Sequence, residues 1–135
     1  MTDVHLAKVA SIQRCVSRAR QEYAEAGAAF CTDMTRQDAA VLNIMRACET
    51  AIDLANALIR ERQLGIPTSN RDSFRLLAEG GVISSDLAGS LQRMVGFRNV
   101  AVHRYRDLDV AIIASVITRD LDDLLTFTEL VARVV

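Results

Sequence analysis

The segment RNVAVHRY, from Arg98 to Tyr105, contains the side chains of this chain that are best suited to chemistry. Arg98 offers a forked cation for a phosphate oxygen, and a histidine such as His103 can transfer protons near neutral pH. Asn99 and Tyr105 supply further hydrogen bonds. RNA carries its own nucleophile, the 2′-hydroxyl, so these groups could cleave it by proton transfer and charge stabilisation, without a metal. The residue types therefore indicate a phosphate site.

Residue types alone leave another interpretation open, because such a cluster at a helix end more often forms a hydrogen-bonded cap or turn. Neighbouring cations favour an anion site. Arg93, Arg104 and Arg106 add positive potential, which Asp107 and Asp109 offset only in part. These three arginines are candidates for RNA binding.

Helical geometry restricts how the motif can act. At about 100° per residue, Arg98 and His103 diverge by about 140° on a continuous helix, so one regular helix cannot aim both at one small group. Either the helix breaks within the motif, or two copies of the chain face each other across a two-fold axis. Tyr105 would lie on the same side as Arg98 if the helix continued. Its phenol would then border the phosphate site, unless it only covers the helix end.

Length and composition predict one helical domain spanning residues 1–135. Half of the chain is apolar and it contains one proline, Pro67, which favours an all-α fold. The net charge of −1 excludes a global field that would attract nucleic acid or an anionic membrane. Cys15, Cys31 and Cys48 lack metal-ligand spacing and are expected to be reduced. No signal peptide or transmembrane stretch is recognisable, so a cytoplasmic protein is expected.

The apolar spacing predicts a succession of helices joined by short turns. The central helix is expected to begin at a Thr35-x-x-Asp38 capping box and to end before Gly65 and Pro67. The expected helices run from Thr2 or Asp3 to about Ala28, from Thr35 to about Gln63, from Thr68, Ser69 or Asn70 to Gly80, from Ser84 or Ser85 through the motif, and from Asp107 or Asp109 to the end of the chain.

The central helix carries an apolar stripe wider than one core contact requires. Such a helix either lies at the centre of a small bundle or serves both a core and a second surface, such as a dimer interface. One apolar row consists of Leu42, Met45, Ile52, Ala55 and Ile59, the other of Val41, Ile44, Cys48, Ala51 and Leu58, and the polar face of Asn43, Arg46, Thr50, Asp53 and Arg60.

Two further polar groups are expected on solvated helix surfaces. His5 lies near the start of the first helix, whose apolar stripe is expected to begin at Val4. Asp120, Asp122 and Asp123 lie together, but no histidine or cysteine joins them, so a metal site is not expected there.

The motif resembles that of a known family. Arg98-Asn99-x-x-x-His103-x-Tyr105 is similar to the R-x4-6-H motif of the HEPN superfamily, in the R-x4-H-x-Y form of the HepT-like toxins (the DUF86 group). The similarity extends over residues 51–109, roughly half of the chain, from the central helix through the last loop. The end helices agree with the family in length and character, and no motif position departs from its pattern.

The resemblance implies an all-α antiparallel bundle of about four to five helices. Such a protein forms a homodimer, or a higher oligomer with its antitoxin, and has no membrane partner. Dimerisation brings two motifs into one cleft. Many members are metal-independent endoribonucleases, the toxins of type VII-like toxin–antitoxin pairs, without a cofactor of their own. The antitoxin is typically a minimal nucleotidyltransferase, which can transfer AMP from ATP to the motif tyrosine and silence the toxin.

Carried over to this chain, the resemblance makes His103 the general base or acid and Arg98 the phosphate binder. Asn99 would orient the substrate or the histidine, and Tyr105 would be the modified residue. The RNA could be tRNA or mRNA. A non-catalytic HEPN module that binds nucleotides or acts as a scaffold for the nucleotidyltransferase is the alternative, and a purely structural helical dimer would explain the apolar stripes. The intact pair of Arg98 and His103 favours the enzyme.

Overall fold

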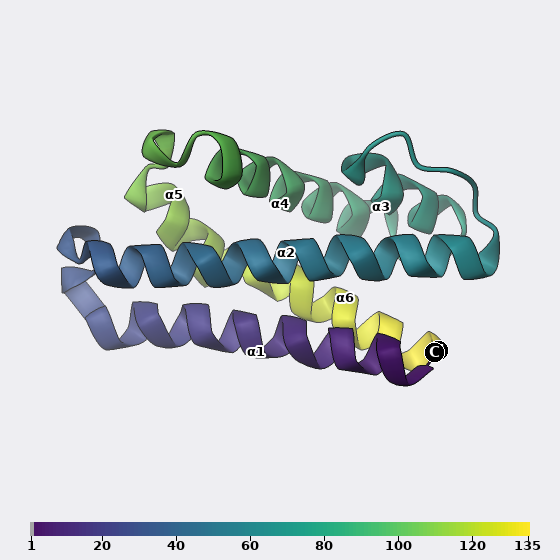
Figure 1. Ribbon diagram of the computed structural model, residues 1–135, viewed down its shortest axis with the longest axis horizontal. Coiled ribbons are helices and arrows are strands. Elements are labelled where there is room, and N and C mark those ends of the chain that lie inside the picture. The colour runs from purple at the N-terminus through teal and green to yellow at the C-terminus, as the bar shows by residue number, and fades with distance from the viewer. Residues whose placement is uncertain (1) are drawn as a thin grey trace.

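The computed structural model describes residues 2–135, with side chains from Asp3 onward, and every regular element in this range is helical. Across these residues the chain forms five helical runs, packed as an antiparallel bundle, which confirms the predicted fold class (Figure 1). The elements are α1 (Thr2–Ala26), a 3₁₀ segment (Gly27–Thr32), α2 (Met34–Arg62), α3 (Asn70–Glu79), α4 (Ser85–His103), a 3₁₀ turn (Tyr105–Asp107), α5 (Val110–Ser115), a π-helical segment (Val116–Asp120) and α6 (Leu121–Val134).

The central helix of the bundle is α2. It forms a long antiparallel hairpin with α1, while α4 runs antiparallel along another side of α2 and α6 passes behind them (Figure 1). The core between these helices is mainly aliphatic, and Phe74 and Phe127 meet edge to face in it, with ring centroids 5.8 Å apart. Within residues 2–135, no helix is long and apolar enough to cross a membrane.

The two apolar rows of α2 differ in burial. The row that contains Ile44 and Cys48 is fully buried. The other row is exposed at Leu42, half-buried at Met45 and buried from Ile52 onward. The central position of α2 therefore accounts for most of the stripe, and a surplus apolar surface remains only in the N-terminal half of this helix.

Local capping signals set the helix ends, with one correction at α2. The predicted capping box at Thr35 is wrong, because α2 begins at Met34 and the carboxylate of Asp33 accepts a hydrogen bond from the backbone amide of Arg36 at 3.1 Å. Aspartate caps a helix at least as well as threonine, and Asp33 directly follows the 3₁₀ segment where the chain has already turned. The other caps fall within the predicted choices: Ser69 for α3, Ser84 for α4 and Asp109 for α5.

The first turns of α1 overturn two predictions. His5, expected on a solvated surface, is only 2% exposed, and its Nε2 atom lies 2.8 Å from Oε1 of Glu61 near the end of α2. Val4, expected in the apolar stripe, is 53% exposed. His5 lies one turn before the buried Val9, on the side of α1 that packs against the bundle. The Glu61 carboxylate supplies the partner that a buried ring nitrogen requires.

The last helical run covers the core as predicted, with a π-helical segment joining α5 to α6. The predicted solvated face on this run is only partly correct. Asp122 is exposed and pairs with Arg20 at 2.6 Å. Asp123 is half-buried, and burial followed by the negative charge of Asp120 raises the pKa of its carboxyl group.

Candidate functional site

The motif lies at the C-terminal end of α4. Ser84 caps the start of this helix, and the buried side of α4 packs against the rest of the bundle. The helix is continuous from Arg98 to His103 and ends at Arg104, whose φ is −141° and whose amide donates to the carbonyl oxygen of Val100 at 2.7 Å. A break between Arg98 and His103 is therefore excluded, and the divergence of about 140° between them remains.

Arg98 is anchored on α2. Its guanidinium pairs through Nε and Nη2 with the carboxylate of Glu49, and its Nη1 donates to Oδ1 of Asn99 at 3.0 Å. The Arg98 side chain is 19% exposed. One edge of the cation is thus fixed by the protein, and Asn99 directs its amide oxygen to the arginine rather than to the histidine.

His103 is the last residue of α4, and it is exposed. Its side chain makes no hydrogen bond or ion pair within residues 3–135. The polar contacts of Arg98 are to Glu49 and Asn99 and not to His103. The imidazole is therefore open to a substrate or to a second protein chain. One copy of the chain does not bring Arg98 and His103 together on one small group.

Tyr105 lies beyond the helix end, in the 3₁₀ turn Tyr105–Asp107. The helix does not continue, so the tyrosine is not aligned with Arg98; the turn carries it to the start of α2, where its hydroxyl donates to a carboxylate oxygen of Asp38. Partial burial and the neighbouring Asp38 raise the pKa of Tyr105 to about 12. The phenol is therefore protonated at neutral pH, although the residue is 40% exposed.

Two polar contacts thus join the end of α4 and the following turn to α2. We call the Arg98–Glu49 contact the arginine rung and the Tyr105–Asp38 contact the tyrosine rung. Asp38 and Glu49 are eleven residues apart, which places them within about 20° of each other around α2 and about 16 Å apart along it. Because α2 and α4 are antiparallel, the two rungs bind the motif to one side of α2.

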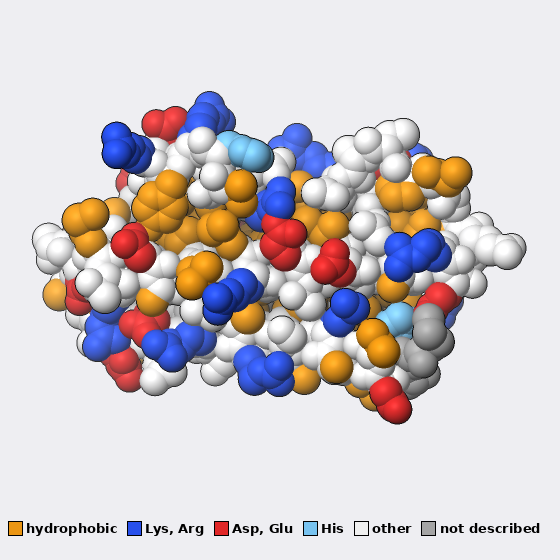
Figure 2. Space-filling model, viewed as in Figure 1, with side chains coloured by type: hydrophobic (Ala, Val, Ile, Leu, Met, Phe, Trp, Pro, Cys, Tyr) orange, Lys and Arg blue, Asp and Glu red, His pale blue; other side chains and the backbone are white. Residues whose placement is uncertain are grey.

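Exposed apolar side chains lie between the two rungs. Leu42 is 44% exposed, Val102 is 41% exposed and Met45 is half-buried. Figure 2 shows apolar side chains gathered over the N-terminal half of α2 beside the end of α4, with charged groups around them. We call these three residues the α2–α4 apolar patch.

The three arginines predicted to bind RNA are all exposed. Nη2 of Arg93 donates to Oγ of Ser90 at 3.0 Å. Nε of Arg104 lies 4.0 Å from Oδ2 of Asp107, a contact between two exposed groups that contributes little. Arg106 forms no ion pair within the described part of the chain. The positive charge of Arg104 and Arg106 is therefore available to an anion near His103, whereas Arg93 lies ten residues earlier on α4, where it also acts on the carboxylate of Asp123.

Sequence reasoning did not identify Glu49 as part of the site and assigned Asp38 to a helix cap. A signal for Glu49 was present, because this carboxylate interrupts an apolar row between Met45 and Ile52. No comparable signal marks Asp38. Its contact with the tyrosine exists only because the helix ends after His103.

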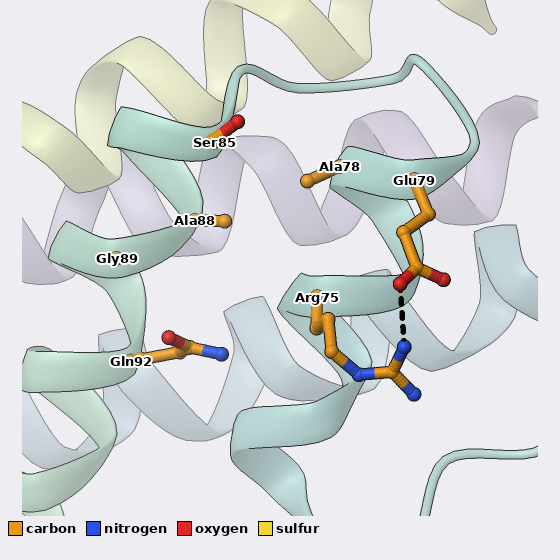
Figure 3. A pocket seen from close by; sticks show the side chains of 7 residues that line it. All are labelled: Arg75, Ala78, Glu79, Ser85, Ala88, Gly89 and Gln92. Atoms are coloured by element: carbon orange, nitrogen blue, oxygen red, sulfur yellow. Dashed lines mark hydrogen bonds and ion pairs between the residues drawn. The ribbon is translucent and has the colours of Figure 1, made fainter.

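The motif forms an open surface site. Four cavities of about 300 to 450 Å³ lie elsewhere, and none of them is lined by Arg98, His103 or Tyr105. One, of about 310 Å³, lies between α3 and α4 (Figure 3). Within residues 3–135, no three His, Cys, Asp or Glu side chains are grouped so that they could hold a metal ion. An open strip of polar and cationic groups fits a polymer better than an enclosed small molecule.

The fold and the motif define an all-α bundle of the HEPN type, with R-x4-H-x-Y at the end of its fourth helix. The family model described as "Ribonuclease HepT-like" matches residues 12–131. The chain belongs to this family of HepT-like ribonucleases, as the motif predicted.

Known relatives agree with this assignment. The "mRNA nuclease HepT" of Shewanella oneidensis is 44% identical over 131 residues, which cover 97% of this chain and 98% of that protein. The solved structure of a tri-AMPylated Shewanella oneidensis HEPN toxin in complex with its MNT antitoxin has a TM-score of 0.92 and 42% identity, and the match covers 98% of this chain and 99% of that one. A toxin–antitoxin structure with AMP-PNP has the same TM-score and identity, with 97% and 98% covered.

Proposed function

We propose that this protein is the toxin of a type VII-like toxin–antitoxin pair, a metal-independent endoribonuclease that cleaves RNA in the cytoplasm. One observation carries the proposal: the open end of α4 presents a fixed cation, Arg98, and a free imidazole, His103, among exposed arginines. The ribonuclease family and the 44% identity to an mRNA nuclease support it.

In the proposed reaction, His103 takes the proton from a 2′-hydroxyl as its oxygen attacks the adjacent phosphorus. The bond from phosphorus to the 5′-oxygen breaks, which leaves a 2′,3′-cyclic phosphate and a 5′-hydroxyl. The leaving oxygen receives its proton from the second His103 of a dimer or from water. Arg98 binds a non-bridging oxygen and stabilises the charge that develops on the phosphate, while Asn99 supports the guanidinium. The substrate supplies the nucleophile, so no metal is required.

A second copy of the chain completes this site. Arg98 and His103 diverge by about 140° on a continuous helix, so one copy cannot direct both at one phosphate. The α2–α4 apolar patch lies beside both residues and fits a contact across a two-fold axis. Such an axis would bring Arg98 of one protomer toward His103 of the other. An interface above roughly 1,000 Å² is expected for a stable dimer.

The partner in this proposal is a minimal nucleotidyltransferase that silences the toxin by AMP transfer to Tyr105. The related toxin in the solved complex carries AMP groups. The tyrosine oxygen attacks the α-phosphorus of ATP, the bond to pyrophosphate breaks, and Asp38 is placed to accept the phenol proton. The new phosphodiester adds charge and bulk at the cleft and can pair with the neighbouring Arg104, so it competes with RNA without refolding.

A non-catalytic module that binds nucleotides or acts as a scaffold is the second candidate. The arginine rung favours it, because Glu49 already neutralises the cation that RNA would use. The two candidates differ in whether the protein alone breaks RNA.

An RNA cleavage assay in EDTA separates them. The wild-type protein should cut single-stranded RNA, and His103→Ala should lose about 10²–10⁴-fold in rate. The variant should keep its helicity and melting temperature, because the exposed imidazole makes no polar contact in the described residues. Full activity of stably folded His103→Ala would falsify the catalytic role. Wild-type protein that binds RNA without cutting it would favour the scaffold.

A further inference from the structure

Arg71, in the first turn of α3, lies against the backbone of α4 at Gly96. A Cβ atom at position 96 would lie 2.9 Å from Nη2 and 3.9 Å from Cζ of Arg71. The guanidinium therefore occupies the space that a side chain on α4 would need. The two helices are joined beside this point, because the side-chain amide of Gln92 donates to the carbonyl oxygen of Arg71 at 3.0 Å.

The charge of Arg71 remains available, in contrast to that of the next arginine on α3. Arg71 is exposed and forms no ion pair within residues 3–135. Arg75, one turn later, pairs with Asp72 at 2.5 Å and with Glu79 at 2.6 Å, and Figure 3 shows it turned toward Glu79 at the cavity between α3 and α4. One arginine thus stabilises its own helix, whereas the other has a charge that an anion can use.

Gly96 and His103 share one side of α4. They are seven residues apart, so their directions differ by about 20° and their positions along the helix by about 10 Å. The guanidinium over Gly96 and the imidazole of His103 consequently lie along one side of α4, two turns apart. A single phosphate group cannot reach both positions, whereas an RNA strand carries a phosphate at every nucleotide.

We propose that Arg71 binds an RNA phosphate that flanks the cleaved bond, and that the strand follows α4 from Gly96 to His103. The inference rests on the proposed ribonuclease function and adds a substrate requirement: the RNA must extend beyond the cleaved bond for Arg71 to contribute. Glycine at position 96 then leaves room for the guanidinium to lie against the helix backbone.

The test compares a long single-stranded RNA with a dinucleotide, whose only phosphate is the one that is cleaved. Arg71→Ala should lower kcat/KM on the long RNA by about 10-fold, mainly through KM, as expected for the loss of one charged contact. Its cleavage of the dinucleotide should equal that of the wild type. The slope of log Kd against log salt concentration should fall by about 0.7, the contribution of one single-strand phosphate. Arg75→Ala, the matched control, should leave activity on both RNAs and the salt slope unchanged.

Gly96→Ala is a second perturbation that keeps the charge of Arg71. Alanine favours the helix, so α4 should stay folded, but its Cβ must displace the guanidinium. A smaller loss, again confined to the long RNA, is expected. Wild-type kinetics of Arg71→Ala on the long RNA, or an equal loss on the dinucleotide, would overturn the inference alone. Failure of the wild type to cleave either RNA would overturn the proposed function as well.

Discussion

The arginine rung and the tyrosine rung both pair a side chain of the motif with a carboxylate on one side of α2, yet their surroundings differ. Arg98 belongs to a continuous helix, and its side chain is 19% exposed. Tyr105 follows the helix end, sits in a short 3₁₀ turn and is 40% exposed. The first contact is therefore built into the bundle, whereas the second holds a surface turn.

In the proposed function, this difference separates Arg98, which needs a fixed position to bind phosphate, from Tyr105, which another protein must reach. A phosphate binder acts best when its donors are already oriented before the reaction. A tyrosine that is to be modified must be reached by another active site, and an exposed surface turn permits this without unpacking α4. Changes to the arginine rung should therefore affect RNA cleavage, and changes to the tyrosine rung should affect silencing.

Among changes to the two rungs, removal of Arg98 should have the largest effect. Arg98→Ala is expected to lower the cleavage rate by about 10²–10³-fold, because the developing charge on the phosphate loses an oriented donor. Arg98→Lys keeps the charge without the fork and should recover only part of the activity. Steady-state kinetics on one RNA measure both, with Arg14→Ala on the exposed side of α1 as the control. A lysine variant equal to the wild type would mean that the fork is not used.

A carboxylate placed between the rungs tests whether the cleft is shared. Leu42→Asp should weaken the dimer by about 30-fold or more and lower cleavage in parallel, because one chain cannot aim both groups at one phosphate. Light scattering over a range of protein concentrations measures the first effect. Ile66→Asp, at an 88% exposed apolar residue between α2 and α3, should change neither. A wild-type protein that stays monomeric at micromolar concentration would remove the shared cleft.

The sequence was sufficient for the order of the helices and for the place of the motif, because both depend on local spacing. It was not sufficient for the geometry of the site. Spacing alone left open whether the helix continues past His103, whereas the helix ends there and Tyr105 contacts Asp38, 67 residues away. His5 was misplaced for the same reason, since its burial depends on Glu61, 56 residues away. Contacts between distant segments decide both cases, and a single helical pattern does not contain them.

The tyrosine rung predicts how silencing proceeds. The cognate nucleotidyltransferase with Mg-ATP should add one or more AMP units to Tyr105, and cleavage should fall in parallel. Tyr105→Phe should block this addition. Asp38→Asn should slow it, because an amide does not accept the phenol proton, while unmodified activity stays within a few-fold of the wild type. Peptide mass spectrometry after co-expression measures the modification, and Asp86→Asn, at an exposed carboxylate on α4, is the control.

Two outcomes would contradict AMP transfer to Tyr105 with Asp38 as the proton acceptor. An unmodified Tyr105 in a fully silenced complex would exclude the covalent mechanism and leave steric occlusion by the antitoxin. Normal transfer to the Asp38→Asn variant would show that the nucleotidyltransferase supplies its own base.

Neutralising the carboxylate of the arginine rung should have a smaller effect. Glu49→Gln keeps an oxygen that accepts from Arg98 but removes a negative charge, so RNA should bind a few-fold more tightly at low salt. Glu49→Ala removes the acceptor too and should lower kcat, because the guanidinium loses its orientation. Binding and kinetics measured with one RNA distinguish charge from position. Identical behaviour of the two variants would show that Glu49 does not orient Arg98.

The smallest expected effect is a change in the titration of the tyrosine rung. Burial and Asp38 raise the pKa of Tyr105 to about 12, above the value of about 10 expected in the unfolded chain. Since the folded state holds this proton more tightly, the contact contributes stability that is fully present below about pH 10 and is lost as the pH rises through about 12. This loss should become smaller when the carboxylate is replaced, because the contribution of burial to the pKa of Tyr105 remains.

A Tyr23→Phe background makes Tyr105 the sole tyrosine of the chain, so the tyrosinate absorbance reports on it alone. In this background the midpoint should lie near the raised pKa. Asp38→Asn should bring it closer to the ordinary value, because the amide removes the negative charge that opposes ionisation of the phenol. Equal midpoints would mean that the tyrosine rung does not form in solution. Arg98 would then still be fixed by Glu49, but no contact with α2 would hold the exposed Tyr105.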